Sequence, residues 1–261
     1  MKGKNLRKIA ASTIILILLT VNTYGQDHQL FTDVLKDYVK NGLVDYKNLR
    51  KDDRLPRYLE QLSKTNTEEL TRNEKLAFWI NAYNAFTLHI INENYPVGSI
   101  TDLHTGGRII GYLLGKTVWD KEFIEINGDK YNLNKIEHEI LRKMDEPRIH
   151  FTIVCASISC PELRNEAFEA NKIETQLEEQ ALKFTNDSSR NQFDLENREA
   201  KISEIFNWFE EDFGNSEEEV LMFIADYLPK EITVDINNNI SEWDVSYMDY
   251  NWGLNEYTKS N

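Results

Sequence analysis

The stretch TRNEKLAFWINAYNAFTLHIINEN, residues 71–94, decides the fold. Thr71 and Glu74 match a capping box, in which two side chains bind the free N–H groups at the start of a helix, and Pro96 marks the end of that helix. Apolar side chains cover nearly every direction around it, namely Leu76, Phe78, Trp79, Ile80, Tyr83, Phe86, Leu88, Ile90 and Ile91. Since a helix that is apolar all round is buried, we expect it at the centre of the fold.

Shorter elements surround this helix in the sequence. Apolar spacing predicts further helices over residues 30–39, around 58–62, and over 134–143, 173–184, 202–213 and 217–227. The pair Asn127-Gly128 predicts a tight hairpin within 119–131. The β-branched run 149–155 predicts a buried strand, and residues 232–252 predict strands around a turn at 237–239. This order indicates an α+β fold, with helices around a central buried helix packed on a largely antiparallel sheet.

The first 25 residues have the pattern of a secretory signal peptide. Four positive charges, at Lys2, Lys4, Arg7 and Lys8, precede an apolar run over 9–21, and small residues follow at 23 and 25. The run is about 13 residues long, short of the roughly 20 that a bilayer-spanning helix needs. We therefore expect cleavage near Gly25, a periplasmic or secreted protein without an integral membrane span, and a single α+β domain over 26–261, because no linker or repeat interrupts that range.

The net charge bears on the classes of binding partner, and the cysteine count bears on the source of stability. Loss of the four N-terminal positive charges takes the formal net charge from −14 to −18, so we expect nucleic acid and anionic lipid to be poor partners. Two cysteines are too few for a disulfide scaffold, so the stability of the domain must come from packing. In the leading hypothesis we expect no cofactor and no metal ion.

The predicted helix over 134–143 carries a carboxylate on its apolar stripe. The stripe is formed at three- and four-residue spacings by Leu133, Ile136, Ile140, Leu141 and Met144, and Glu137 falls inside it. Burial disfavours the ionised carboxylate and raises its pKa unless a cation or several donors compensate. Glu137 and the neighbouring His138 are therefore candidate catalytic groups. The alternative is that Glu137 accepts a buried hydrogen bond and His138 is half exposed.

Two carboxamides lie three residues apart on the central helix. Asn81 and Asn84 share a face with small and apolar residues, so both amides point into an apolar region. Such amides can bind a substrate amide or stabilise an oxyanion. The alternative is that they tie the backbone of a neighbouring loop to the helix.

The segment CASISCP, residues 155–161, follows the predicted strand and enters a loop. A thiol at such a position can be a nucleophile when an imidazole activates it. Three alternatives stay open: Cys155 and Cys160 form a disulfide, Cys155 is an inert core residue, or both bind zinc with a histidine. In a regular strand His150 and Cys155 face opposite ways, which favours His138 as the activating base.

Four motifs occur together in one order: FWINAYNA (78–85), IEHEILR (136–142), HFTIVCASISCP (150–161) and YMDYNWGLN (247–255). So arranged, they resemble the uncharacterised domain-of-unknown-function 547 family over essentially the whole range 27–255. The resemblance implies that the Asn pair, the Glu-His pair and the first cysteine are shared, while the second cysteine can be serine in some relatives. This favours Cys155 as an individual group over the disulfide and zinc alternatives. The family has no established reaction.

The leading hypothesis is a thiol-dependent hydrolase or acyl-transfer enzyme that acts on an envelope peptide or amide. Cys155 is its nucleophile, His138 its base and Glu137 its orienting group or acid, while Asn81, Asn84, His150 and Cys160 are substrate-binding candidates. A cysteine, a histidine and amides near a central helix are also reminiscent of papain-like folds, by analogy only. The alternative hypothesis is a non-catalytic envelope module that binds a peptide or glycan.

Overall fold

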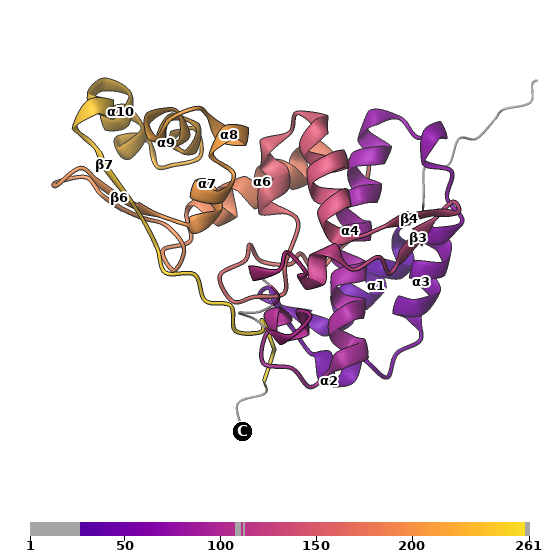
Figure 1. Ribbon diagram of the computed structural model, residues 1–261. Coiled ribbons are helices and arrows are strands. Elements are labelled where there is room, and N and C mark those ends of the chain that lie inside the picture. The colour runs from indigo at the N-terminus through magenta and orange to yellow at the C-terminus, as the bar shows by residue number, and fades with distance from the viewer. Residues whose placement is uncertain (1–26, 108–110, 112, 259–261) are drawn as a thin grey trace, which may run out of the picture.

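The computed structural model describes residues 27–107, 111 and 113–258 (Figure 1). The predicted signal peptide, residues 1–25, lies outside these ranges. Within them, no helix combines the length and the apolar character that crossing a membrane requires.

The long helix α4, Arg72–Asn94, is the centre of the first half of the molecule, as predicted. Thr71 and Glu74 form the capping box at its start, and every residue from Leu76 to Leu88 is buried. Around it lie α1 (Gln29–Tyr38), α2 (Tyr46–Leu49) and α3 (Arg54–Ser63), with the short antiparallel pair β1 (Val39–Lys40) and β2 (Leu43–Val44) (Figure 1). The side chains of these elements form one hydrophobic core around α4.

The predicted hairpin is confirmed. Strands β3 (Ile124–Ile126) and β4 (Asp129–Tyr131) pair antiparallel, and Asn127 and Gly128 form the turn with φ values of 52° and 84°. Positive φ at both turn residues is the geometry that a two-residue hairpin turn requires, and asparagine and glycine adopt it most readily.

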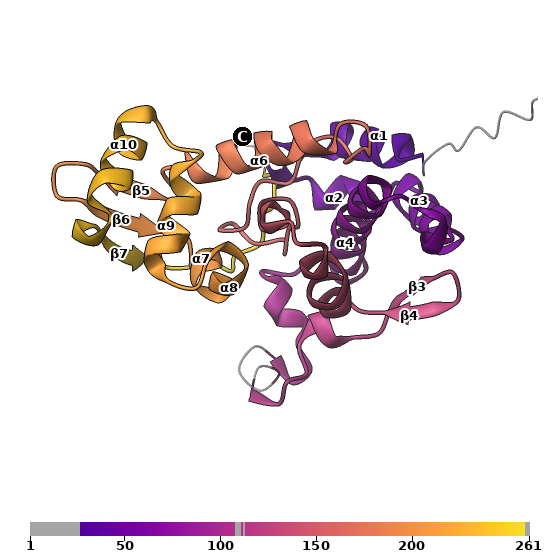
Figure 2. The same ribbon diagram turned by 90° about the horizontal axis from the view of Figure 1, so that it is seen from above.

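The second half of the molecule combines helices with a three-stranded sheet. Helix α6 (Ile173–Thr185) extends from the first half toward this group (Figure 2). The sheet has the order β5 (Gln192–Asp194), β6 (Glu199–Ile202), β7 (Asp244–Tyr247), antiparallel between β5 and β6 and parallel between β6 and β7. Helices α7 (Glu204–Trp208), α8 (Glu210–Phe213), α9 (Glu217–Ala225) and α10 (Lys230–Asn239) complete it. A second, phenylalanine-rich core lies inside this group, and Tyr250 packs against both cores.

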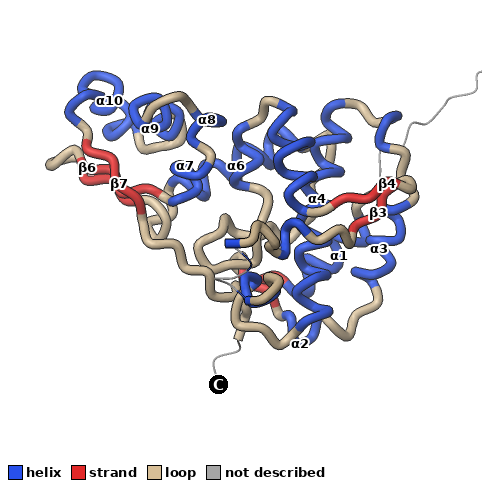
Figure 3. The backbone as a smooth tube through the Cα atoms, viewed as in Figure 1, coloured by secondary structure: helices blue, strands red, loops and turns tan. Residues whose placement is uncertain are grey.

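Short helical turns connect these elements. The 3₁₀ turns are η1 (Thr67–Glu69), η2 (Ile100–Leu103), η3 (Val118–Asp120), η5 (Arg142–Met144), η6 (Pro147–Phe151) and η7 (Ile240–Glu242), and η4 (Lys135–Leu141) is a helix of the wider π type. Figure 3 shows that helices predominate and that strands form only small sheets. The α+β class is thus confirmed.

Two sequence predictions of strands are wrong. Residues 147–151 form the 3₁₀ helix η6, which starts at Pro147, and the chain beyond it is irregular. The backbone N–H of Val154 donates to the Asn84 side chain, which replaces a strand partner. The tail forms helix α10 over 230–239 where strands and a turn were expected, and only β7 is extended. The expected helix over 202–213 is interrupted at Phe209, between α7 and α8.

Candidate functional site

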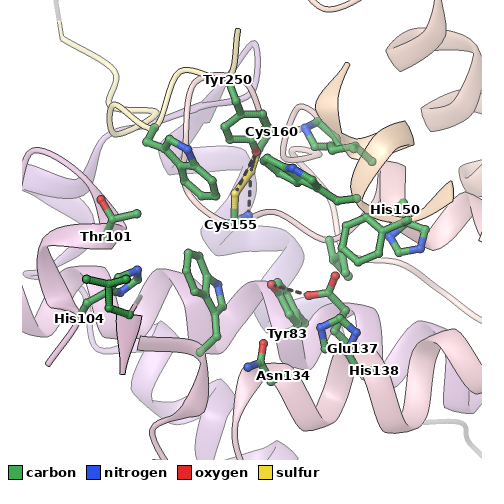
Figure 4. Close-up of a pocket in the computed structure, with 18 residues that line it drawn as sticks. Tyr83, Thr101, His104, Asn134, Glu137, His138, His150, Cys155, Cys160 and Tyr250 are labelled. Atoms are coloured by element: carbon green, nitrogen blue, oxygen red, sulfur yellow. Dashed lines mark hydrogen bonds between the residues drawn. A yellow bond between two sulfur atoms is a disulfide. The ribbon is translucent and has the colours of Figure 1, made fainter. Parts of the chain in front are cut away.

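A cleft of about 790 Å³ lies where the two halves of the molecule meet (Figure 4). Its lining includes Tyr83 and Ile153 from the first core, Ile205 from the second, and Tyr250, which packs against both. A cavity of this size with a few polar groups suits a small molecule or a short peptide segment.

Aromatic rings form one wall of the cleft. Trp208 and Trp252 stack with ring centroids 5.6 Å apart and an interplanar angle of 20°, and Tyr250 lies 4.6 Å from Trp252. Trp119 meets Trp252 edge to face at 5.9 Å. Trp208 is 45% exposed, an unusual fraction for so large an apolar side chain, so the wall presents apolar surface to solvent.

Glu137 lines the cleft from η4. Its side chain is only 8% exposed, and the Tyr83 hydroxyl donates to its Oε2 atom over 3.1 Å (Figure 4). Burial raises the pKa of Glu137 to about 7, against the hydrogen bond from Tyr83 and the charge of Arg142, which lower it. The predicted burial of this carboxyl is confirmed, and near neutral pH it can both donate and accept a proton.

His138 also lines the cleft but is exposed. Its Nδ1 atom accepts a hydrogen bond from Arg142 over 3.1 Å. Arg142 in turn forms ion pairs with Glu211 and Asp212, each at 2.5 Å. The hydrogen-bond partner of His138 is therefore an arginine, whereas the sulfur of Cys155 contacts other groups.

His150 is buried and pairs with a carboxylate that sequence analysis did not identify. Its Nε2 lies 2.7 Å from Asp212 Oδ2, and its ring stacks on Phe209 at 4.1 Å. Burial opposes ionisation of Asp212, but hydrogen bonds from His150 and Arg142 hold its pKa well below the usual range. Burial lowers the pKa of His150, against the hydrogen bond and the charge of Asp212, which raise it. His150 and Cys155 both line the cleft, which corrects the expectation that they face opposite ways.

Cys155 and Cys160 are joined by a disulfide. The structure therefore adopts the disulfide alternative, and not the inert core cysteine or the zinc site. Cys155 is half-buried on the cleft, while Cys160 is 3% exposed. The Cys155 sulfur lies 3.0 Å from the Ser157 hydroxyl and 3.3 Å from the Tyr250 hydroxyl. The nucleophilic role expected of Cys155 needs a free thiol, so it requires that this bond first be reduced.

The loop that carries the disulfide is clamped from two sides. The C-terminal segment runs along it, with Ile158 N donating to Gly253 O over 2.8 Å and Asn255 N donating to Ala156 O over 3.0 Å. On the other side the Arg190 guanidinium donates to the carbonyls of Ile158 and Cys160, over 2.9 and 2.8 Å. The sulfur atoms are therefore fixed relative to Tyr250.

Asn81 and Asn84 hold backbone groups and do not line the cleft. Asn81 binds both the N–H and the C=O of Phe168, over 2.9 and 2.8 Å. Asn84 binds the C=O of Thr152 and the N–H of Val154, both over 2.9 Å. Because both ends of each buried amide have backbone partners, the structure supports the alternative in which they tie loops to α4, and not an oxyanion or substrate role.

The zinc alternative needed Cys155, Cys160 and a histidine to converge on one point. Among the described residues, no group of three or more His, Cys, Asp or Glu side chains is arranged to hold a metal ion. The sulfur atoms of the two cysteines instead bind each other.

Much of the cleft wall comes from residues that were not predicted to belong to the site. Tyr250 and Trp252 belong to the motif over 247–255, which was used for the family resemblance but not for the site. Trp208 and Asp212 belong to a segment taken as an ordinary helix. The density of aromatic residues in the C-terminal motif is the one local signal that pointed to a binding surface.

No curated protein and no solved structure matches the chain. The family model described as "Protein of unknown function, DUF547" matches residues 67–185. The matched span includes α4, η4 and the disulfide loop, which carry three of the four motifs. Over residues 67–185 the match supports the resemblance of this chain to the domain-of-unknown-function 547 family.

Proposed function

We propose that the protein is an exported binding module whose cleft holds a peptide segment with apolar side chains. The observation that carries this proposal is the aromatic wall of Trp208, Tyr250 and Trp252 in a cleft of about 790 Å³. Tryptophan and tyrosine are the side chains that most often dominate the binding energy of protein interfaces, because each buries a large rigid surface at a small entropic cost.

The polar groups of the cleft favour a peptide over a glycan. A sugar presents hydroxyls around its whole ring, and each hydroxyl that is buried without a partner costs free energy. Apolar peptide side chains need no such partners, and the peptide backbone needs only a few donors and acceptors. Glu137, with a pKa of about 7, and the nearby Asn134 supply both kinds of group.

Fluorescence anisotropy with labelled peptides tests this proposal. All peptides in the panel have the same length, and their alternating side chains are aromatic, aliphatic or charged. Labelled chito-oligosaccharides are tested separately as glycan ligands. Aromatic or aliphatic peptides should bind, and Trp208→Ala should weaken that binding about 30-fold, the equivalent of about 2 kcal/mol for a central aromatic contact.

Met222→Ala is the matched control, because Met222 is 49% exposed on α9 and lies outside the cleft lining. Its binding should equal that of the unaltered protein. Binding to the oligosaccharides alone would show that the ligand is a glycan and not a peptide. Equal losses of affinity in Trp208→Ala and Met222→Ala would show that the cleft is not the binding surface.

A second candidate is the thiol-dependent hydrolase or acyl-transfer activity. It is favoured by one observation, that Cys155, His138 and Glu137 line the same cleft. After reduction, the Cys155 thiolate would attack a carbonyl carbon, and Glu137 or His138 would protonate the leaving group.

Turnover of amide and thioester model substrates by reduced protein tests the second candidate. Activity that appears only after reduction and is lost in Cys155→Ser supports it. Equal rates for the oxidised and reduced protein would exclude Cys155 as the nucleophile.

A further inference from the structure

The two sulfur atoms of the disulfide differ in exposure and in surroundings. Cys155 is half-buried on the cleft, so an attacking group in the cleft can reach its sulfur. Cys160 also lines the cleft but is only 3% exposed. A nucleophile that enters from the cleft therefore meets Cys155 Sγ first, and the Cys160 sulfur is the leaving group.

Hydrogen-bond donors surround the Cys160 sulfur. The backbone N–H of Cys155 donates to it over 3.0 Å, and the Tyr250 hydroxyl lies 3.2 Å away. Ser157 Oγ donates to the Tyr250 oxygen over 3.2 Å, so the Tyr250 proton is available to the sulfur of Cys160 or to that of Cys155, which lies 3.3 Å away. Donors that point at a sulfur stabilise its thiolate, and a more stable thiolate leaves faster in exchange.

We infer that the Cys155–Cys160 disulfide is an exchange centre that oxidises thiol-bearing peptides held in the cleft. The structure places an accessible sulfur on the cleft, a buried partner sulfur among donors, and an aromatic binding wall beside them. The exchange step needs only an open cleft, while the choice of a peptide as substrate rests on the proposed function.

The chemistry balances with a dithiol substrate. The first substrate thiolate attacks Cys155 Sγ, a mixed disulfide forms, and Cys160 leaves as a thiolate that takes up the proton lost by the substrate. The second substrate thiolate then attacks the substrate sulfur of the mixed disulfide and releases Cys155 as a thiol. The substrate loses two electrons and two protons and becomes a disulfide, and the protein gains both as a dithiol.

Reduction of the native disulfide by dithiothreitol at neutral pH is the first test. The rate constant for reduction is measured for the folded protein and for the protein unfolded in urea. Each value is divided by the rate constant with which dithiothreitol reduces oxidised glutathione in the same solvent. An exchange centre should react at least tenfold faster folded than unfolded, because folding supplies the donors around Cys160. A purely structural disulfide is protected by folding, so an equal or slower rate in the folded protein would overturn the inference.

Tyr250→Phe tests the donor that lies beside the sulfur atoms. It keeps the ring that packs on both cores and removes the hydroxyl, so the folded rate should fall about tenfold and the pKa of the Cys160 thiol should rise. Tyr247→Phe is the matched control, since its hydroxyl bonds Glu217 on α9. Unchanged rates in Tyr250→Phe would remove Tyr250 from the exchange step.

Trapping of a mixed disulfide tests the exchange step separately from the preference for a peptide substrate. Cys160→Ser, in which Cys155 is a free thiol, should form a mixed disulfide with oxidised glutathione and release one reduced glutathione, seen by intact mass, while Cys155→Ser should react at least tenfold more slowly. Disulfide-linked cysteine peptides with aromatic neighbours should react faster than oxidised glutathione. If oxidised glutathione reacts and the peptides react no faster, the exchange step is supported and the peptide as substrate is refuted. If neither reacts with Cys160→Ser, the exchange centre itself is refuted.

Discussion

Replacement of Glu137 by glutamine should stabilise the protein at alkaline pH and leave it nearly unchanged at acidic pH. The folded pKa of Glu137 is about 7, while the ordinary value is 4.5. Between these two values the unfolded chain has released a proton that the folded protein still holds. The free energy of unfolding therefore falls as the pH rises through this window, and the full cost is present above pH 7.

The size of the effect follows from the two pKa values. Their difference of about 2.5, at 1.36 kcal/mol for each pKa unit, corresponds to about 3 kcal/mol above neutral pH. A glutamine carries no proton to release, and its side-chain oxygen can accept the hydrogen bond from Tyr83. Glu137→Gln should thus gain about 3 kcal/mol at pH 8 and less than about 0.5 kcal/mol near pH 4.5.

Urea unfolding of the oxidised protein, followed by tryptophan fluorescence at both pH values, measures this difference. Glu139→Gln is the matched control, because Glu139 is an exposed residue of the same helix, and its change should stay within about 0.5 kcal/mol at both pH values. A loss of stability in Glu137→Gln at pH 8, or an equal change at the two pH values, would refute the reasoning that burial governs this carboxyl.

Three further outcomes are expected. Protein recovered from its native compartment should have the mass of a chain that begins at Gln26, and a mass that retains residues 1–25 would contradict the proposed export. Asn84→Ala should lose about 3 kcal/mol in urea unfolding, because it leaves two buried backbone groups without partners, whereas the exposed Asn207→Ala should lose little; equal losses would show that the buried amide has no structural role. Thr71→Ala should cost about 1 kcal/mol by removing the cap of α4, and an unchanged melting curve would contradict that role.

The elements whose signals are local were predictable from the sequence. The capping box at Thr71 fixed the start of α4, and the pair Asn127-Gly128 fixed the hairpin turn. Both signals depend on residues within a few positions of each other, so the rest of the fold does not alter them. The burial of Glu137 followed in the same way from the apolar stripe of its own helix.

The two wrong strand predictions have different causes. Residues 149–155 are β-branched, but Asn84, 70 residues away from Val154, takes the backbone group that a strand neighbour would bind. In the tail, Ile232, Ile236 and Ile240 recur every four residues, a helical spacing that the β-branched composition obscured.

The site was predictable in part. Glu137, His138, His150, Cys155 and Cys160 were all named from the sequence, and all line one cleft. Their partners were not, since Asp212 is 62 residues from His150 and Tyr250 is 95 residues from Cys155. A single sequence carries no signal for such pairings, which arise only when the two halves of the molecule meet.

The late position of Tyr250 in the chain sets the order in which this region is built. During synthesis both cysteines emerge before Tyr250 and the segment over 251–255, which pairs with their loop. The two thiols of the nascent chain can therefore meet before Tyr250 and this segment are synthesised. Because the whole sequence contains only these two cysteines, that early encounter offers just one intramolecular bond, and the last segment closes over a pairing that is already correct.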